Sequence, residues 1–285
     1  MTLLAVPNVS EGRDPARIAH LVGVVEAHGA RVLDTHSDAS HHRSVLTLTA
    51  PAEDLISACT ALAVAASAID LRTHHGVHPR LGGLDVCPIV PHQAGMGQAV
   101  DAARSLAERI GSEAHLPVYL YGNAATRDES RELSDLRRGG LAALAVRAGD
   151  DLPPDAGPHE VDPVRGVVCV GARGPLIAFN VWLDAGVDLA RAVARQVRSP
   201  AVRALGLEVE GATQVSMNLI QPLTVGIEET FETVRSRADE LGASVFATEI
   251  VGLVERRFLP PPDATVARLL LEPGHCLEER LERLG

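Results

Sequence analysis

The sequence predicts an α/β (α+β) fold of two ferredoxin-like βαββαβ subdomains that flank a ligand cleft. An order of strand, helix, strand, strand, helix and strand occurs twice, and a segment rich in proline and glycine separates the two copies. With 46% hydrophobic residues, a chain of 285 residues can fill two cores. We therefore expect an N-terminal subdomain at 1–174 and a C-terminal subdomain at 175–285 that ends in a helical tail. Ligands often bind between two such units.

The elements of the first copy follow from apolar periodicity and helix end signals. Asp14 is a suitable N-cap and Gly29 a suitable stop for the first helix. We expect strands at 3–9, 30–37, 43–50 and 84–90, helices at 14–29 and 52–69, and an extension by a helix at 97–110 and a strand at 116–122.

The second copy repeats this order after a connecting region. Residues 138–174 contain several prolines and glycines, and we interpret them as a connection with one strand of its own at 166–172. The second copy is predicted to have strands at 176–183, 202–209, 213–220 and 244–254 and helices at 186–197 and 225–242.

Composition excludes several classes of protein. A net charge of −11 without a basic stripe argues against nucleic-acid binding and against an anionic membrane surface. The four cysteines are scattered without a CxxC pair, which is typical of a reducing compartment. The sequence contains no apolar run of transmembrane length and no recognisable signal peptide, so we expect a soluble cytoplasmic protein.

The stretch THHGVHPRLGGLDVCP, residues 73–88, places three histidines, an arginine and a glycine pair before a strand. A glycine-rich loop at the end of a rigid element is a frequent position for function. An imidazole titrates near neutral pH, and we therefore predict that His78 is the general acid/base. Arg80 is a candidate fork for a substrate carboxylate. Gly82 and Gly83 are expected to allow close approach of a ligand.

A second polar cluster lies in the turn between two predicted strands. DTHSDASHHRS, residues 34–44, holds three histidines and two aspartates beside Arg43. Histidine and aspartate ligate zinc and iron, but the spacing matches no familiar metal motif, so we predict no metal. Asn8 and Asn180 occupy corresponding positions in the opening strands of the two copies. A ligand role and a simple strand-end role are both open for them.

Several motifs together resemble the glutamate formimidoyltransferase (formiminotransferase) family, which includes the transferase part of formiminotransferase-cyclodeaminase. The resemblance extends to about Val254 and contains no cyclodeaminase part. The motifs occur in family order: VPNVSEGR (6–13), SDASHHRSV (37–45), HHGVHPRLGGLDVCPIVP (74–91), LPVYLYG (116–122), VGARGPLIAFNV (170–181), QVSMNL (214–219) and EIVGLV (249–254).

This resemblance implies an activity, in which a formimino group moves from N-formimino-L-glutamate to N5 of tetrahydrofolate during histidine degradation. It implies tetrahydrofolate as co-substrate, a homodimer and His78 as the catalytic histidine. Arg43 and Arg80 are our candidates for the glutamate carboxylates, with Asn8 and Asn180 as hydrogen-bonding partners. By motif position the following residues are implied to line the folate site: Gly157, Pro158, His159, Glu160, Val161, Asp162, Pro163, Val164, Arg165 and Gly166.

Departures from the family pattern leave alternatives open. His36 stands where the animal enzymes carry an aspartate that assists the catalytic histidine, so Asp34 or Asp38 is the candidate to orient His78. His42 replaces the usual asparagine before Arg43. One alternative is a related folate enzyme that uses 5-formyltetrahydrofolate or N-formylglutamate. A second alternative is a metal-assisted hydrolase that uses His36 and His42. A third is a non-catalytic folate-binding module.

Overall fold

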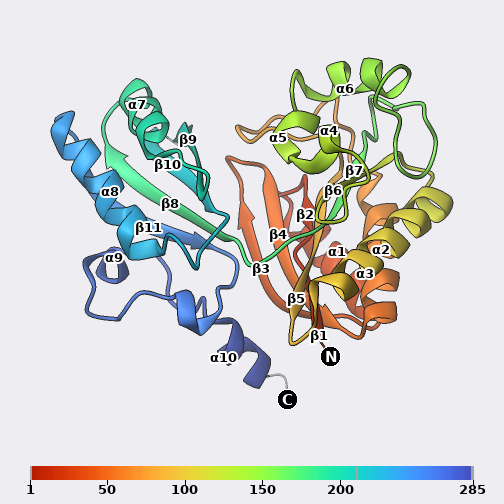
Figure 1. Cartoon of the computed structure of the whole chain (residues 1–285), viewed down its shortest axis with the longest axis horizontal. Coiled ribbons are helices and arrows are strands. Elements are labelled where there is room, and N and C mark those ends of the chain that lie inside the picture. Colours follow the sequence, from red (N-terminus) through yellow and green to blue (C-terminus); the bar gives the residue numbers. More distant parts are fainter. Residues whose placement is uncertain (1, 210, 284–285) are drawn as a thin grey trace. The chain divides into compact units, whose positions relative to one another are not determined.

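The computed structural model describes residues 2–209 and 211–283 of the chain. It divides the chain into two compact units, Met1–Gly174 and Pro175–Gly285, each with its own sheet (Figure 1). Within the described residues, no helix is both long enough and apolar enough to cross a membrane.

The first unit contains a seven-stranded sheet and a layer of helices. Its strands are β1 (Thr2–Ala5), β2 (Asn8–Val9), β3 (Arg31–Asp38), β4 (Arg43–Ala50), β5 (Leu84–His92), β6 (Val118–Gly122) and β7 (Val168–Ala172). Its helices are α1 (Pro15–Ala27), α2 (Ala52–Ala66), α3 (Met96–Arg109), the π-helical turn η1 (Ile110–Ala114), α4 (Asp128–Arg131), α5 (Leu133–Leu136) and α6 (Gly140–Ala148).

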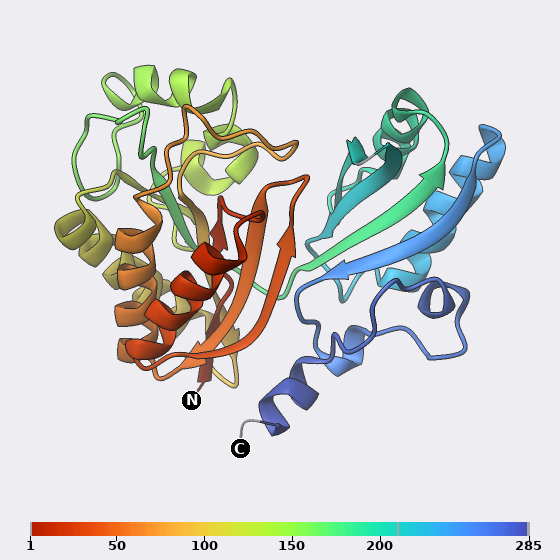
Figure 2. The same ribbon diagram turned by 180° about the vertical axis from the view of Figure 1, so that it is seen from behind.

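The N-terminal part of this sheet has the predicted βαββαβ order. β4 lies between β3 on one side and β1 and β2 on the other, and β5 pairs antiparallel with β1 and β2. The helices α1, α2 and α3 pack side by side on one face of the sheet (Figure 2). Buried Ala, Val, Leu and Ile from these helices and strands form the core. The predicted α/β class is thus confirmed.

The opening strand differs from the prediction of one continuous strand at 3–9. It breaks into β1 and β2 at Val6 and Pro7, where proline lacks the N–H that a sheet ladder needs. The chain still bonds to both neighbours at the break, because Val6 N–H donates to Pro88 O (3.0 Å) and Leu46 N–H donates to Pro7 O (3.0 Å). The break positions Asn8 beside β4 and β5.

Residues 138–174 are more than a connection between the two units. The prediction that they form a connecting region is therefore corrected. β7 lies inside the first sheet, where it pairs parallel with both β5 and β6. The helices α4, α5 and α6 pack over the sheet with a separate small core that includes Leu136, Leu144 and Tyr119. This segment therefore belongs to the first unit, and Arg137, which directly precedes it, pairs with Asp85 at the start of β5.

The second unit is a four-stranded antiparallel sheet with two long helices. Its elements are β8 (Ile177–Asp184), α7 (Val187–Val197), β9 (Val202–Val209), β10 (Ala212–Leu219), α8 (Ile227–Glu240) and β11 (Ser244–Val251). The strand order β11-β8-β10-β9 is that of a ferredoxin-like unit, as predicted. Alternate residues of the strands, including Phe179, Val215 and Met217, form the core with α7 and α8.

The C-terminal tail is only partly helical. It contains the short elements η2 (Arg256–Phe258), α9 (Thr265–Arg268) and α10 (Leu277–Glu282). Between them, Thr248 and Val254 form single parallel bridges with Leu270 and Cys276. The tail therefore stays attached along one edge of the second sheet, next to β11.

Candidate active site

The loop that carries His78 runs between α2 and β5 and is tied to the turn between β3 and β4. Val77 N–H donates to Ser40 O at 3.2 Å. Gly76 lies so close to that turn that a Cβ atom would stand 2.3 Å from His41 O. The two histidine-rich segments that the sequence singled out thus lie against each other within the first unit.

Arg80 joins these two segments. Its guanidinium donates to His42 O (3.2 Å), His41 O (2.9 Å) and His78 O (2.8 Å). It also lies 2.6 Å and 2.8 Å from the ring nitrogens of His74. Burial and the charge on Arg43 lower the pKa of Arg80 to about 10, so it remains charged at neutral pH. Through these contacts Arg80 holds the His78 loop against the β3–β4 turn.

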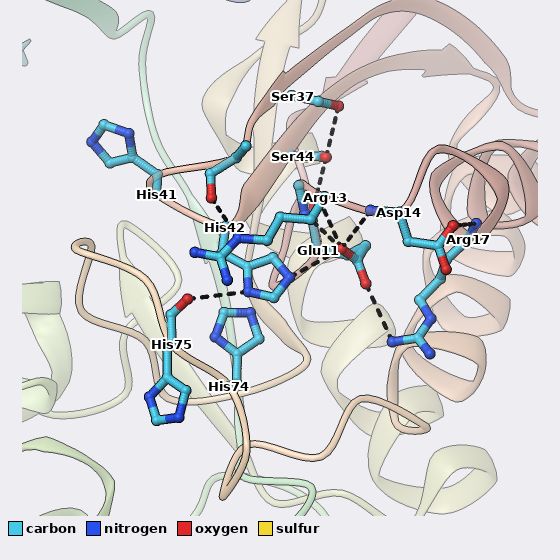
Figure 3. A network of polar contacts seen from close by, with 12 residues as sticks. Glu11, Arg13, Asp14, Arg17, Ser37, His41, His42, Ser44, His74 and His75 are labelled. Carbon is cyan, nitrogen blue, oxygen red and sulfur yellow. Dashed lines mark hydrogen bonds and ion pairs between the residues drawn. The ribbon is translucent and has the colours of Figure 1, made fainter. Parts of the chain in front are cut away.

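A buried carboxylate, Glu11, supports the same segments from the end of β2 (Figure 3). Its Oε1 accepts backbone N–H groups of Gly12 (3.0 Å), Arg13 (2.9 Å) and Asp14 (3.1 Å), while Oε2 accepts from Arg17 (3.2 Å). Burial raises the pKa of Glu11, but the hydrogen bonds from the backbone and His42 outweigh it and lower that pKa overall. The charged carboxylate therefore anchors the start of α1.

His42 links Glu11 to the His78 loop. Its Nε2 lies 3.1 Å from Glu11 Oε1, and its Nδ1 lies 3.2 Å from His75 O. Both ring nitrogens of His42 thus face oxygens of these two segments. The ring stacks on His74 at 3.9 Å (Figure 3). His42 has a left-handed backbone with φ of 49°, a conformation in which histidine and asparagine are enriched.

Beneath the loop, Asp85 lies at the start of β5 with no exposed surface. Its Oδ2 accepts from Arg43 and from Arg137, each at 2.6 Å, and its Oδ1 accepts Leu81 N–H at 2.7 Å. Burial raises the pKa of Asp85, but the charges on Arg137 and Arg43 outweigh it and hold that pKa well below its usual range. Two guanidinium groups on one carboxylate leave a net positive charge.

His78 is partly buried beside this cluster. Its Nδ1 lies 2.7 Å from Pro79 O, which can only accept, so Nδ1 carries the hydrogen and Nε2 the lone pair. Burial, followed by the positive charges on Arg43 and Arg137, lowers the pKa of His78 to about 3. At neutral pH the ring is therefore a neutral base whose accepting nitrogen is Nε2.

The two candidate aspartates lie differently with respect to His78. Asp38 accepts the His41 N–H at 2.6 Å and pairs with its Nδ1 at 3.0 Å, and the His41 ring lies 6.1 Å from the His78 ring. Asp34 lies four residues earlier on β3, about 13 Å along the strand. Asp38 thus pairs with His41, and its role in orienting His78 stays a prediction.

The candidate asparagines and the remaining arginine make defined contacts. Asn8 accepts from Arg43 Nε at 3.0 Å and donates to Val6 O at 2.8 Å. In the second unit, Asn180 donates to Glu249 Oε2 at 2.9 Å. Asn8 and Arg43 therefore belong to the charge cluster around Asp85, and Asn180 to a separate polar group on β8 and β11.

The segment 157–166 lies against both ends of the His78 loop. Leu71 N–H donates to Val164 O, and Val167 N–H donates to Leu81 O, each at 2.9 Å. Gly82 bridges to Gly166, and a Cβ on Gly82 would stand 2.0 Å from Val167 O. Gly82 and Gly83 are thus required by close approach of the chain to itself. Their predicted close approach to a ligand stays a prediction.

Sequence reasoning missed three charged residues of the candidate site: Glu11, Asp85 and Arg137. Glu11 lies within the VPNVSEGR motif, and Asp85 is a lone carboxylate in an apolar strand. The sequence therefore contained a signal that could have identified both residues. Arg137 has none, because it lies in an arginine-rich segment whose fold was not predicted. In the described part of the chain, no three His, Cys, Asp or Glu side chains are grouped to hold a metal ion.

Comparison with known proteins agrees with this fold. Residues 2–173 match the N-terminal subdomain of the formiminotransferase domain, and residues 178–260 match the formiminotransferase domain. The two units thus have the architecture that defines this class of domain. The chain belongs to the formiminotransferase family, which confirms the resemblance.

Similar curated proteins include two of comparable length. A glutamate formimidoyltransferase of Streptococcus pyogenes is 37% identical, with 89% of each chain covered. One of Thermoplasma acidophilum is 33% identical, with 98% of this chain and 96% of the relative covered. The formimidoyltransferase-cyclodeaminase of Sus scrofa is 33% identical over 98% of this chain, but over only 56% of the longer pig protein.

Proposed function

We propose that this chain is a glutamate formimidoyltransferase. It moves the formimino group of N-formimino-L-glutamate to N5 of tetrahydrofolate, a step in histidine degradation. Family membership and curated relatives of that name support the assignment. The observation that carries the chemistry is a neutral His78, with Nε2 as acceptor, next to a buried cluster of net positive charge.

His78 acts as the proton carrier in this proposal. The folate N5 attacks the amidine carbon, and a tetrahedral intermediate forms. Nε2 takes the N5 proton and then gives it to the departing glutamate nitrogen, so the C–N bond to glutamate breaks as the ring returns to neutral. General acid–base catalysis of this kind contributes roughly 10²–10⁴-fold in rate. Asp38 would orient His78 through His41, which pairs with it.

The positive cluster would bind the donor. The donor carries two carboxylates, and Arg43 and Arg137 share a single counter-charge, Asp85. The Nε of Arg137 has no hydrogen-bond partner among the described residues, so it retains a donor for a ligand. A bound carboxylate would offset the positive charges that lower the pKa of His78 and thereby raise its basicity when substrate arrives.

Other parts of the assignment stay proposals. We assign residues 157–166 to folate binding, because they pack on both ends of the His78 loop. We keep the proposal that Arg80 contacts a substrate carboxylate, in addition to holding the His78 loop against the β3–β4 turn. Asn8 acts through its hydrogen bond to Arg43. Tetrahydrofolate is the co-substrate and no metal takes part. The protein acts in the cytoplasm as a homodimer, which light scattering of the purified protein tests.

The direct test is an assay of the transfer itself. The protein is incubated with tetrahydrofolate and formiminoglutamate, and 5-formiminotetrahydrofolate is followed by its absorbance. Formylglutamate and 5-formyltetrahydrofolate serve as competing substrates. We expect turnover with the formimino donor at a kcat/KM well above that with the formyl compounds. No 5-formimino product, or a preference for a formyl compound, would contradict the proposal.

A further inference from the structure

Arg173 of the first unit directly follows β7 and has no counter-charge. Its backbone N–H donates to Ile89 O at 3.0 Å, so the chain still follows the sheet at this point. Its guanidinium donates to Gly174 O at 3.0 Å, and no carboxylate among the described residues forms an ion pair with it. The side chain is partly buried, and burial lowers the pKa of Arg173, which Tyr121 offsets only in part. A partly buried cation without a counter-charge is costly, and a bound anion would remove that cost.

Strand geometry places Arg173 on the same face of the first sheet as Tyr121. β6 and β7 are parallel neighbours, with Tyr121 of β6 opposite Gly171 of β7 (Figure 1). The Tyr121 ring covers Gly171, because a Cβ atom at Gly171 would stand 2.5 Å from Tyr121 Cε1. Side chains alternate along a strand, so Arg173 lies on the face of Gly171. The guanidinium and the phenol therefore share one part of this face.

Tyr121 connects Arg173 to the positive cluster beside His78. The Tyr121 side chain is buried, and its hydroxyl interacts with the charges on Arg43, Arg137 and Arg173. In the described part of the chain, Asp85 is the one carboxylate that forms ion pairs with these arginines. Three guanidinium groups with one carboxylate leave an excess of two positive charges around Tyr121.

A ligand with two carboxylates matches this excess charge. In formiminoglutamate the α-carboxylate is attached to the carbon that bears the departing nitrogen, and the γ-carboxylate lies at the other end. Because the departing nitrogen must reach His78, the α-carboxylate belongs at Arg43 and Arg137, the charges that act most strongly on His78. The His78 loop joins the start of β5, whereas Arg173 follows the end of β7, which runs parallel to β5. The position of Arg173 therefore suits the γ-carboxylate.

We propose that Arg173, together with the Tyr121 hydroxyl, binds the γ-carboxylate of the donor and thereby selects glutamate over its γ-amide. This inference rests on the function proposed above. A guanidinium can donate two parallel hydrogen bonds to a carboxylate, and a phenol can donate a third. A γ-amide carries no charge, so it would leave the charge on Arg173 without compensation. Arg173 and Tyr121 are thus determinants of donor specificity.

The kinetic test compares N-formimino-L-glutamate with N-formimino-L-glutamine as donors. Wild-type protein should prefer the glutamate donor by at least about tenfold in kcat/KM, because one charged contact is lost with the amide. In Arg173→Gln this preference should fall to about twofold or less through a higher KM for the glutamate donor, with kcat and the KM for tetrahydrofolate nearly unchanged. Arg173→Lys keeps the charge and should recover part of the preference. A wild-type preference that persists in Arg173→Gln would overturn the proposal.

A binding test needs no turnover. Glutarate carries both carboxylates and no reactive group, and glutaramate replaces one of them by an amide. By isothermal titration calorimetry, wild-type protein should bind glutarate at least about tenfold more tightly than glutaramate, and Arg173→Gln should bind the two alike. The control is Arg109→Gln, because Arg109 is also partly buried in the first unit but pairs with Glu53 at 2.7 Å. That variant should keep the wild-type difference. Equal affinity of wild-type protein for the two compounds would contradict the inference.

The outcomes separate this inference from the proposed function. If wild-type protein transfers the formimino group but Arg173→Gln keeps the preference for the glutamate donor, only the Arg173 assignment fails. If Arg173→Gln weakens glutarate and glutaramate equally and also lowers the melting temperature, the role of Arg173 is structural and the assignment fails as well. If wild-type protein has no transferase activity, the proposed function fails, while glutarate binding that depends on Arg173 would still support a dicarboxylate site.

Discussion

At the scale of single residues, the central group is His78, and the charges around it set its chemistry. Burial, followed by the charges on Arg43 and Arg137, lowers its pKa, and Pro79 O fixes the hydrogen on Nδ1. The loop and its histidine could be predicted from sequence, because their composition and motif are local. The role of Arg137 could not be predicted, because it lies 52 residues after Asp85 in the sequence. Its segment reaches Asp85 only through long-range packing.

Arg137→Gln tests this electrostatic coupling. Removal of one positive charge should raise the pKa of His78 toward the ordinary value of about 6.5. It should also raise KM for the donor several-fold. Histidine ring NMR over pH, with His78 assigned from its own variant, measures the shift. Arg138→Gln, an exposed neighbour paired with Asp135, is the matched control and should leave the titration unchanged. An unaltered His78 titration in Arg137→Gln would refute the coupling.

At the scale of elements, the strands and long helices were largely predictable, since their apolar periodicity is local. Asp14 caps α1 as predicted, with its carboxylate accepting from Ala16 and Arg17. The insertion of β7 between β5 and β6 was not predictable, because parallel pairing joins segments about 80 residues apart. The same insertion explains Gly82, which packs against Val167.

Gly82→Ala should therefore destabilise the first unit. Its Cβ would meet Val167 O at 2.0 Å, so the base of the His78 loop must move away from β7. We expect a loss of about 2–4 kcal/mol in the free energy of unfolding, as for other severe steric substitutions. Gly97→Ala in α3 is the control, because nothing lies within 4 Å of its Cβ. That variant should be neutral or more stable by up to about 1 kcal/mol. Equal denaturation curves for the two variants would contradict the packing.

At the scale of the whole molecule, the sequence predicted the α/β class and the family, both of which are confirmed. Contacts between segments that lie far apart along the chain could not be predicted from the sequence. Glu11, His42, His74 and Arg80 meet only because β2, the β3–β4 turn and the His78 loop converge in the folded first unit. The titration of His74, whose pKa burial lowers to about 4, links the loop to the stability of the fold.

Stability should consequently fall on mild acidification. Burial, together with nearby arginine charges, lowers the pKa of His74 to about 4 and that of His78 to about 3, against about 6.5 in the unfolded chain. Between these values the unfolded chain binds more protons, so stability is full above pH 6.5 and declines below it. His74→Phe keeps the stack on His42 and removes one titrating ring. Its melting temperature should fall less than that of wild type between pH 7 and pH 5. An equal or larger fall would exclude His74 from this dependence.

The most direct test of the account is the transfer rate of His78→Ala, measured with its affinity for 5-formyltetrahydrofolate. If the imidazole at 78 carries the proton between the folate and glutamate nitrogens, kcat should fall by at least about 100-fold while the folate Kd stays within about tenfold. A variant that still transfers the formimino group at the wild-type rate would contradict the central claim.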